Sequence, residues 1–427
     1  MDENDGVRTR LTHSHEVANL ARSIGARAFA AISQQISQQF GSSDVGLTTV
    51  VQPILQAAGL GHDLGNPPFG HQGEAAIGTW FRRREAWIFS HQKQGGEPLI
   101  EPIPREYQSE FTEFDGNPQS LRLLSKLQTH IDGIGLDLTA ATLAAGLKYP
   151  VSFANKGKRP NPTGKKGGYF LSELDVVEWL RSETGLGEWE RHPLTWIMEA
   201  CDDIAYSVLD IDDVLKKELM SPDDVLAILR RKCQQSVTVD KLTDKFHAVE
   251  SRELGPVIQR DIKIQYLRAL LIADLISHAS GSFQTNSKAI FAHEFEAGLM
   301  DDSKLCEQLK IIARENAFNH PDVLRAEAIG AVAIDGLMSA FWEAIAERKK
   351  PDDLMSERTS ARAKYIFSQI SPNYLLQATT KADGNPIANS MRYKELRLLT
   401  DMISGMTDTF ALRLWKDISS VPHACST

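Results

Sequence analysis

The sequence predicts an all-α protein, and three observations support this class. Apolar residues recur at helical spacing through most of the chain, as at Ile197, Cys201, Ile204 and Val208. Runs that alternate apolar and polar residues are missing, and no Asn-Gly pair marks a hairpin turn. From about residue 221 onward the pattern is that of successive helices joined by short loops. We therefore expect helix packing to form the hydrophobic core.

The composition is that of a soluble globular protein. Of its 427 residues, 42% are hydrophobic and 24% are charged. The formal net charge of −9 argues against a surface that coats nucleic acid, but it leaves room for a local basic pocket that binds a phosphorylated ligand. The four cysteines form no CxxC pair, which indicates a reduced, cytoplasmic setting. No apolar run approaches the roughly 18 residues that a membrane span needs, so we expect no membrane contact.

The first expected helix opens with Arg8-Thr9-Arg10-Leu11-Thr12-His13-Ser14. His13, Val17, Leu20 and Ile24 share one helical face, so the histidine begins an apolar stripe. Arg10 lies one turn before His13, and its guanidinium can reach the same surroundings. A lone histidine in this position is more often structural than functional.

The stretch from Gly61 to Glu74 concentrates polar groups around a rigid turn. His62 and Asp63 end an apolar helical run, and Pro67-Pro68 prevents that helix from continuing. The loop that follows brings His71 and Glu74, spaced three residues apart, to the same neighbourhood. Taken alone, the His62-Asp63 pair favours the interpretation of His62 as a hydrogen-bonded core histidine. His71 would then be a solvated loop residue.

A helix over residues 193–217 is expected to carry the next polar group. Its apolar stripe is opposite Glu199, Asp202, Tyr206 and Asp210, a face that is ordinarily solvent-exposed. Together with the two earlier segments, it supplies two histidines and two carboxylates, which suit a divalent metal. The basic loop over residues 156–168 is either a solvated tip or a lid whose lysines meet phosphate oxygens.

Two parts of the chain are expected to complete one globule: residues 1–220 as the functional core and residues 221–427 as a C-terminal helical region. Further helices are predicted over residues 75–85, 138–148, 258–280, 328–346 and 392–415.

These segments together resemble the HD superfamily of metal-dependent phosphohydrolases, through His13, His62-Asp63 and Asp202. Longer strings narrow the resemblance to the deoxynucleoside triphosphate triphosphohydrolases, the dGTPase-like group. These strings are residues 8–14, 61–74, 114–119, 199–206 and 404–408. The resemblance implies an HD-domain helical fold, with the additional C-terminal helices packed on the same core.

The resemblance also implies residue roles. His13, His62, Asp63 and Asp202 would bind one divalent metal, although spacing alone does not separate Asp202 from Asp203. His71 and Glu74 match the catalytic pair of the family. The residues that correspond to substrate contacts are Arg10, Asn66, Asn117, Lys148, Lys166, Tyr206 and Asp210.

The implied reaction is hydrolysis of a dNTP, with dGTP favoured, to a deoxynucleoside and tripolyphosphate. Mn²⁺ or Mg²⁺ is the favoured metal, and Fe²⁺, Ni²⁺ and Co²⁺ also suit the ligands. Relatives form homo-oligomers, commonly hexamers, and some are activated by dNTPs or single-stranded DNA. They also carry an additional N-terminal segment that helps to shape the nucleoside pocket, which leaves base preference open. The alternatives are hydrolysis of another nucleotide or nucleic-acid phosphate ester, and a non-catalytic nucleotide sensor.

Overall fold

Helices account for all of the regular secondary structure in the described residues, so the all-α prediction is confirmed. The computed structural model describes residues 10–40, 46–90, 102–128, 133–159, 162–316, 321–382 and 385–421. Within these ranges β pairing is limited to one isolated bridge, between Ser152 and Tyr169. Arg8 and Thr9 lie outside the described residues.

The chain divides into two compact units, each built from two separate segments. Unit 1 comprises Met1–Leu60 and Arg191–Leu324, and unit 2 comprises Gly61–Glu190 and Arg325–Thr427. These units are not the ranges 1–220 and 221–427 that we expected from the sequence, and that division stays a prediction. The helical fold is therefore built from interleaved segments of the chain.

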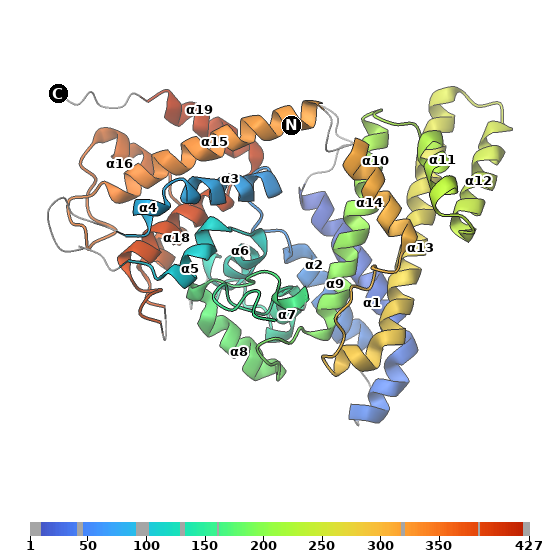
Figure 1. The fold of residues 1–427 in the computed structure, drawn as a ribbon, viewed down its shortest axis with the longest axis horizontal. Helices are drawn as coiled ribbons and strands as arrows, with labels where there is room; N and C mark the ends of the chain where they lie inside the picture. The colour runs from blue at the N-terminus through green and yellow to red at the C-terminus, as the bar shows by residue number, and fades with distance from the viewer. Residues whose placement is uncertain are drawn as a thin grey trace. The chain divides into compact units, whose positions relative to one another are not determined.

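Unit 1 is organised along α13, a helix of 36 residues that packs against α1, α9 and α12 (Figure 1). Pro256 occupies the first turn of α13, where a missing N–H costs nothing, and Leu267, Leu271 and Leu275 are buried along one stripe. The elements of this unit are α1 (Arg10–Phe40), η1 (Leu47–Val51), α2 (Gln52–Gly61), α9 (Pro193–Ile204), η5 (Ala205–Leu209), α10 (Asp210–Lys216), α11 (Pro222–Lys232), α12 (Val237–Glu250), α13 (Pro256–Phe291) and α14 (Lys304–Asn316).

Unit 2 has an aromatic core. Trp80 and Phe81 from α3 and Phe111 from α5 are fully buried and contact one another edge-on or tilted, together with Tyr393 from α18. The elements of this unit are α3 (His71–Arg82), α4 (Glu85–Ile88), α5 (Arg105–Thr112), α6 (Gly116–Arg122), η2 (Leu123–Leu127), α7 (Ala140–Gly146), η3 (Pro162–Gly164), η4 (Leu171–Glu173), α8 (Leu174–Thr184), α15 (Pro321–Ala346), α16 (Ala361–Phe367), α17 (Pro372–Thr379), α18 (Met391–Ser404) and α19 (Asp408–Ser419).

The predicted helix over residues 193–217 is confirmed, with a π-helical segment, η5, between α9 and α10. The prediction of one helix over residues 392–415 is wrong. That helix ends at Ser404, and Thr407 begins α19 because its side chain accepts a hydrogen bond from the N–H of Phe410, at 3.3 Å. The expectation rested on apolar periodicity, which continues across the break.

One helix is longer and more apolar than we expected from the sequence. Residues 323–346 of α15 satisfy the length and composition of a membrane span, and 56% of the most apolar window is buried. Leu337, Met338 and Phe341 belong to the core of unit 2. This burial is typical of a core helix in a soluble protein.

Candidate active site and metal ligands

The loop before α3 places His71 at the first position of that helix. Its backbone turns through two residues in the left-handed region, Phe69 (φ 65°) and Gly70 (φ 56°), after Pro67-Pro68 has ended the preceding helical direction. The first turn of α3 then packs against the loop so closely that a Cβ at Gly73 would lie 2.0 Å from the carbonyl oxygen of Pro68. His71 is thus held by a tight turn at the N-terminus of a helix.

Hydrogen bonds from two other segments of unit 2 fix this loop. The N–H of Gly65 donates to Oγ of Ser120 at 2.9 Å, and the same hydroxyl donates to the carbonyl of His62 at 2.8 Å. The N–H of Phe69 donates to Oδ1 of Asp408 at 3.1 Å. The loop is therefore anchored to α6 on one side and to the first residue of α19 on the other.

His71 and Glu74 form the pair that the sequence predicted. Nδ1 of His71 lies 3.0 Å from Oε2 of Glu74, and the N–H of Gly116 donates to Oε1 of Glu74 at 2.7 Å. The His71 side chain is 78% exposed, whereas that of Glu74 is 13% exposed. The hydrogen bond to Glu74 raises the pKa of His71 above its ordinary value of 6.5, against the opposing effect of burial. The imidazole is thus oriented by a carboxylate that is itself held by α6.

This pair borders a cleft of about 270 Å³ that contains three basic side chains, Arg82, Lys165 and Lys166. Nζ of Lys166 lies 2.5 Å from Oδ2 of Asp115. Burial acts to lower the pKa of Lys166, but the carboxylate of Asp115 outweighs this effect and the pKa is raised. Lys166 is therefore charged in the cleft that His71 also lines, and a charged lysine of this kind can bind phosphate oxygens.

The other predicted substrate contacts of unit 2 lie at different places in that unit. Asn117 follows the N-cap Asp115, and its side-chain amide donates to Oδ1 of that residue at 2.7 Å. Oδ1 of Asn66 lies against Gly116, where it would be 2.0 Å from an added Cβ. Lys148 is not among the residues that line the cleft, and its Nζ lies 5.9 Å from the ring centroid of Tyr149.

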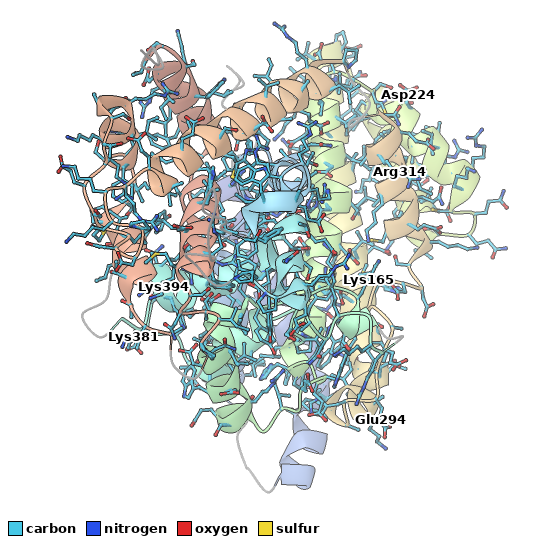
Figure 2. The ribbon with its side chains drawn as sticks, turned by 60° about the vertical axis from the view of Figure 1, so that its left-hand side comes forward. Lys165, Asp224, Glu294, Arg314, Lys381 and Lys394 are labelled. Carbon is cyan, nitrogen blue, oxygen red and sulfur yellow. The ribbon has the colours of Figure 1, made fainter. Side chains whose placement is uncertain are left out.

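Two cleft residues lie outside the individual site assignments made from the sequence, although Lys165 belongs to the basic loop whose lysines were considered as phosphate contacts. Arg82 ends α3, eleven residues after His71, a spacing that returns to the same helical face after three turns. That spacing could have identified it. Lys165 lies in the basic loop beside Lys166 and is labelled in Figure 2. Nothing in the spacing of the sequence distinguished it from its neighbours.

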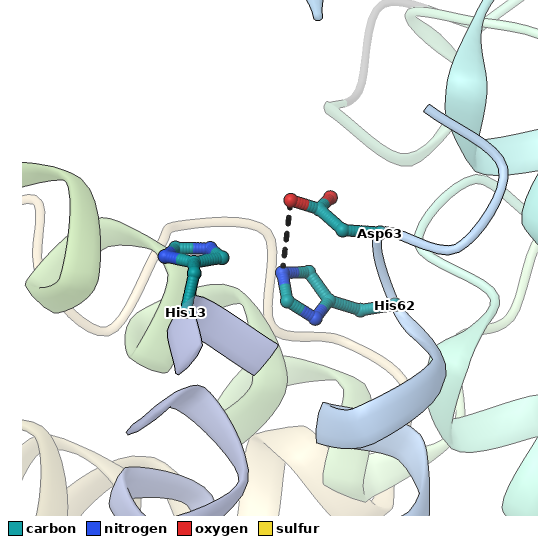
Figure 3. A group of neighbouring side chains, drawn as sticks. All are labelled: His13, His62 and Asp63. Carbon is teal, nitrogen blue, oxygen red and sulfur yellow. Dashed lines mark ion pairs between the residues drawn. The ribbon is translucent and has the colours of Figure 1, made fainter. Parts of the chain in front are cut away.

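Unit 2 also holds two of the four candidate metal ligands. His62 and Asp63 follow the end of α2, and Nε2 of His62 lies 3.4 Å from Oδ2 of Asp63 (Figure 3). Their side chains are 13% and 22% exposed, so both are accessible to a small ion. An imidazole and a carboxylate at this separation are a common donor pair for a divalent metal.

Unit 1 holds the other two candidates and the predicted sugar contacts. The imidazole of His13, near the start of α1, contacts the ring of Tyr206 with the centroids 5.7 Å apart. Asp202 lies on α9, and Asp210 is the first residue of α10. The neighbouring Asp203 forms an ion pair with Lys310 at 2.7 Å. Arg10, the first residue of α1, is exposed.

Comparison with known proteins identifies the relatives of this chain. A deoxyguanosinetriphosphate triphosphohydrolase-like protein of Listeria monocytogenes is 33% identical, over 99% of this chain and 88% of the relative. The deoxyguanosinetriphosphate triphosphohydrolase of Serratia proteamaculans is 32% identical, over 96% and 87% respectively. That of Klebsiella pneumoniae is 30% identical, over 99% and 89%. No protein-family model matches the chain.

The helical fold and its relatives define a phosphohydrolase of the HD type. Within that class, the chain belongs to the family of the deoxyguanosinetriphosphate triphosphohydrolases and their dGTPase-like relatives, and the resemblance inferred from the motifs is confirmed.

Proposed function

We propose that this protein hydrolyses dNTPs, with dGTP the favoured substrate, to a deoxynucleoside and tripolyphosphate, and thereby controls dNTP pools. The observation that carries this proposal is the His71–Glu74 pair, with the pKa of His71 raised, in a cleft that also contains Lys165 and Lys166. This combination supplies a proton-transfer group beside fixed positive charge, which phosphoryl transfer requires.

The proposed cofactor is one divalent metal, Mn²⁺ or Mg²⁺ in preference to Fe²⁺, Ni²⁺ or Co²⁺. Its proposed ligands are His13, His62, Asp63 and Asp202, and the first three are a group of side chains that could hold a metal ion. Two imidazoles and two carboxylates fit the donor preferences of these metals. When bound, the metal would polarise the α-phosphoryl group as a Lewis acid.

The remaining groups are proposed to bind and orient the substrate. Phosphate oxygens would meet Lys166, Lys165 and Arg82 in the cleft, with Arg10, Asn66, Asn117 and Lys148 as further contacts. Tyr206 would lie against the sugar, where its ring would crowd a 2′-hydroxyl and favour deoxyribose, and Asp210 would bind the sugar hydroxyl.

His71 is proposed to transfer the proton. Because Nδ1 faces Glu74, the free ring nitrogen for the reaction is Nε2. It would either take a proton from the attacking water or give one to the leaving oxygen. Glu74 orients the ring and stabilises its protonated form, and Gly116 fixes Glu74 in turn.

We also propose a cytoplasmic homo-oligomer, with a hexamer as the expected form, that is activated by a dNTP or by single-stranded DNA. The three described free cysteines, Cys201, Cys233 and Cys306, are buried, as suits a reducing compartment.

The test is incubation with each dNTP and Mn²⁺ or Mg²⁺, with the phosphate products resolved by ion-exchange chromatography. Tripolyphosphate with free deoxynucleoside supports the proposal and ranks the bases. Pyrophosphate or orthophosphate would instead favour hydrolysis of another phosphate ester. Tight nucleotide binding without any product would favour a non-catalytic sensor.

A matched pair of variants tests the role of His71. His71→Ala should lower kcat by about 10²–10⁴-fold, the usual contribution of a general acid or base, without loss of metal binding. His247→Ala, at an exposed position of α12, should leave kcat unchanged. Equal rates for the two variants would remove His71 from the mechanism.

A further inference from the structure

Unit 2 contains a second cavity, larger than the cleft and sharing no lining residue with it. Its volume is about 550 Å³, within the range of small-molecule sites, and its walls come from η2, η4, α17 and α18 and the segments beside them. Five of its lining residues are basic: Arg122, Lys126, Lys381, Lys394 and Arg397. Asp175 is the one acidic residue among the described residues that line it.

The basic residues of this cavity differ in how far their charges are neutralised. Arg122 forms ion pairs of 2.7 Å with both Glu173 and Asp401, and Lys126 lies 2.7 Å from Asp175. In the described part of the chain, Lys381 and Lys394 have no carboxylate within ion-pair distance. Lys381 and Lys394, both labelled in Figure 2, line the same cavity, and burial together with the positive charge of Lys381 lowers the pKa of Lys394.

Arg397 also lines the cavity and adds to its positive charge. Arg397 is 2% exposed, and its Nη2 donates to Oε2 of Glu110 at 2.6 Å, while Nε and Nη1 have no hydrogen-bond partner among the described residues. Burial raises the pKa of Glu110 to about 7. This shift disfavours the ionised carboxylate beside Arg397.

We propose that this cavity binds a phosphate-bearing small molecule, held by Lys381, Lys394 and the charge of Arg397. Phosphate oxygens are the anions that clustered lysines and arginines bind best. The cavity could hold either a free polyphosphate or the phosphate chain of a nucleotide, since both present the same oxygens.

The helix α6 connects this cavity to the catalytic pair. Arg122, the last residue of α6, lines the cavity, and the N–H of Gly116, its first residue, donates to Glu74. The helix has seven residues, which corresponds to about 10 Å. A ligand that displaces Arg122 would move a short, rigid element whose other end holds Glu74, and thereby His71. We infer that occupancy of the cavity alters the catalytic pair, and this coupling, unlike the binding itself, rests on the proposed function.

Binding is tested by isothermal titration of the full-length protein with inorganic tripolyphosphate, in EDTA so that no turnover occurs. Lys381→Glu and Lys394→Glu should each weaken binding at this site at least tenfold. The matched control is Lys416→Glu, at an exposed position of α19, which should bind as the wild type does. Lys381 is exposed, so its variant should fold normally, and a thermal melt checks this. Wild-type affinity in the Lys381→Glu and Lys394→Glu proteins would overturn the proposal.

A second titration, with ATP, distinguishes a free polyphosphate from the phosphate chain of a nucleotide as the ligand. ATP that binds with the same affinity as tripolyphosphate, and is weakened equally by Lys381→Glu, identifies a site for the phosphate chain alone. ATP that binds more than tenfold tighter identifies a nucleotide site. A Lys381→Glu change that affects neither probe contradicts both.

The coupling is tested by the turnover of dGTP with and without the bound probe. The probe should change kcat in the wild type and not in Lys381→Glu. Binding without any change in kcat would overturn the coupling but not the site. If the protein turns over no dNTP, the proposed function fails by itself, and the coupling is then read from the NMR titration of the His71 imidazole, whose pKa should move when the probe binds.

Discussion

His71 is the residue whose protonation the structure controls most directly. Its folded-state pKa is raised by the hydrogen bond to Glu74, so the contribution of this pair to stability is fully present below pH 6.5 and is lost as the pH rises through the raised value. Glu74→Gln keeps the hydrogen-bonding shape but removes the charge.

We expect Glu74→Gln to lower the pKa of His71 and to move the limb of the pH–rate profile that reports it toward lower pH. Activity that falls above this pKa would identify His71 as the acid, and activity that falls below it would identify the base. The measurements are an NMR titration of the labelled imidazole and kcat as a function of pH. An unchanged imidazole pKa would contradict the role given to Glu74.

Asp408 is expected to position the catalytic loop although it lies 339 residues from Phe69. Asp408→Ala removes the acceptor of the Phe69 N–H, at a turn whose left-handed φ needs support from its surroundings. We expect a loss of about 1–2 kcal/mol in the free energy of unfolding, and about a tenfold lower kcat with a smaller change in KM. Asp408→Asn retains an oxygen acceptor and should recover most of kcat. Equal kcat values for the two variants would count against positioning.

At the scale of elements, the loop of residues 62–70 and the helix α6 form one rigid contact. An added Cβ at Gly65 would lie 2.1 Å from the backbone nitrogen of Ser120, so Gly65→Ala must push α6 away. We expect a loss of at least about 2 kcal/mol in the free energy of unfolding by urea, with most of the activity lost. Gly146→Ala is the control, because a Cβ there meets nothing within 4 Å, and it should stabilise by up to about 1 kcal/mol. A much smaller loss of unfolding free energy in Gly65→Ala would show that the loop and α6 can move apart to accept the added Cβ.

The elements that the sequence could predict are those set by local periodicity. The helix over residues 193–217 follows from its apolar stripe, and the pairing of His71 with Glu74 follows from spacing on one turn. The break at Gly405 could not be predicted in the same way, because Met406 continues the apolar stripe and packs into the core regardless. The support of Glu74 by Gly116 was equally hidden, since it depends on a backbone N–H from another helix.

At the scale of the whole molecule, each of the two units is built from two separate segments of the chain. No local feature of the sequence predicts this division. Of the four proposed metal ligands, His13 and Asp202 belong to unit 1, and His62 and Asp63 belong to unit 2.

If these ligands bind one ion, then Mn²⁺ at a hundredfold excess over its Kd should raise the free energy of unfolding by about 2.7 kcal/mol. The effect should disappear in His62→Ala and in Asp202→Ala, and remain in Asp203→Asn, as measured by thermal melts with and without EDTA. Loss of the effect in Asp203→Asn alone would reverse the choice of ligand.

The two segments of unit 2 are joined by a buried ion pair that should dominate its stability. Arg122 donates to Asp401 through Nε at 2.8 Å and Nη2 at 2.7 Å, and Gln119 donates to the same carboxylate at 2.9 Å. Asp401 is fully buried, so Asp401→Ala would leave the guanidinium with Glu173 as its one remaining carboxylate among the described residues. We expect a loss of about 3–5 kcal/mol in the free energy of unfolding, because a buried charge then lacks much of its compensation. Glu357→Ala, which removes exposed ion pairs with Lys349 and Lys364, should cost far less. Urea unfolding of both variants checks this, and similar losses would show that the buried pair adds no more than a surface pair does.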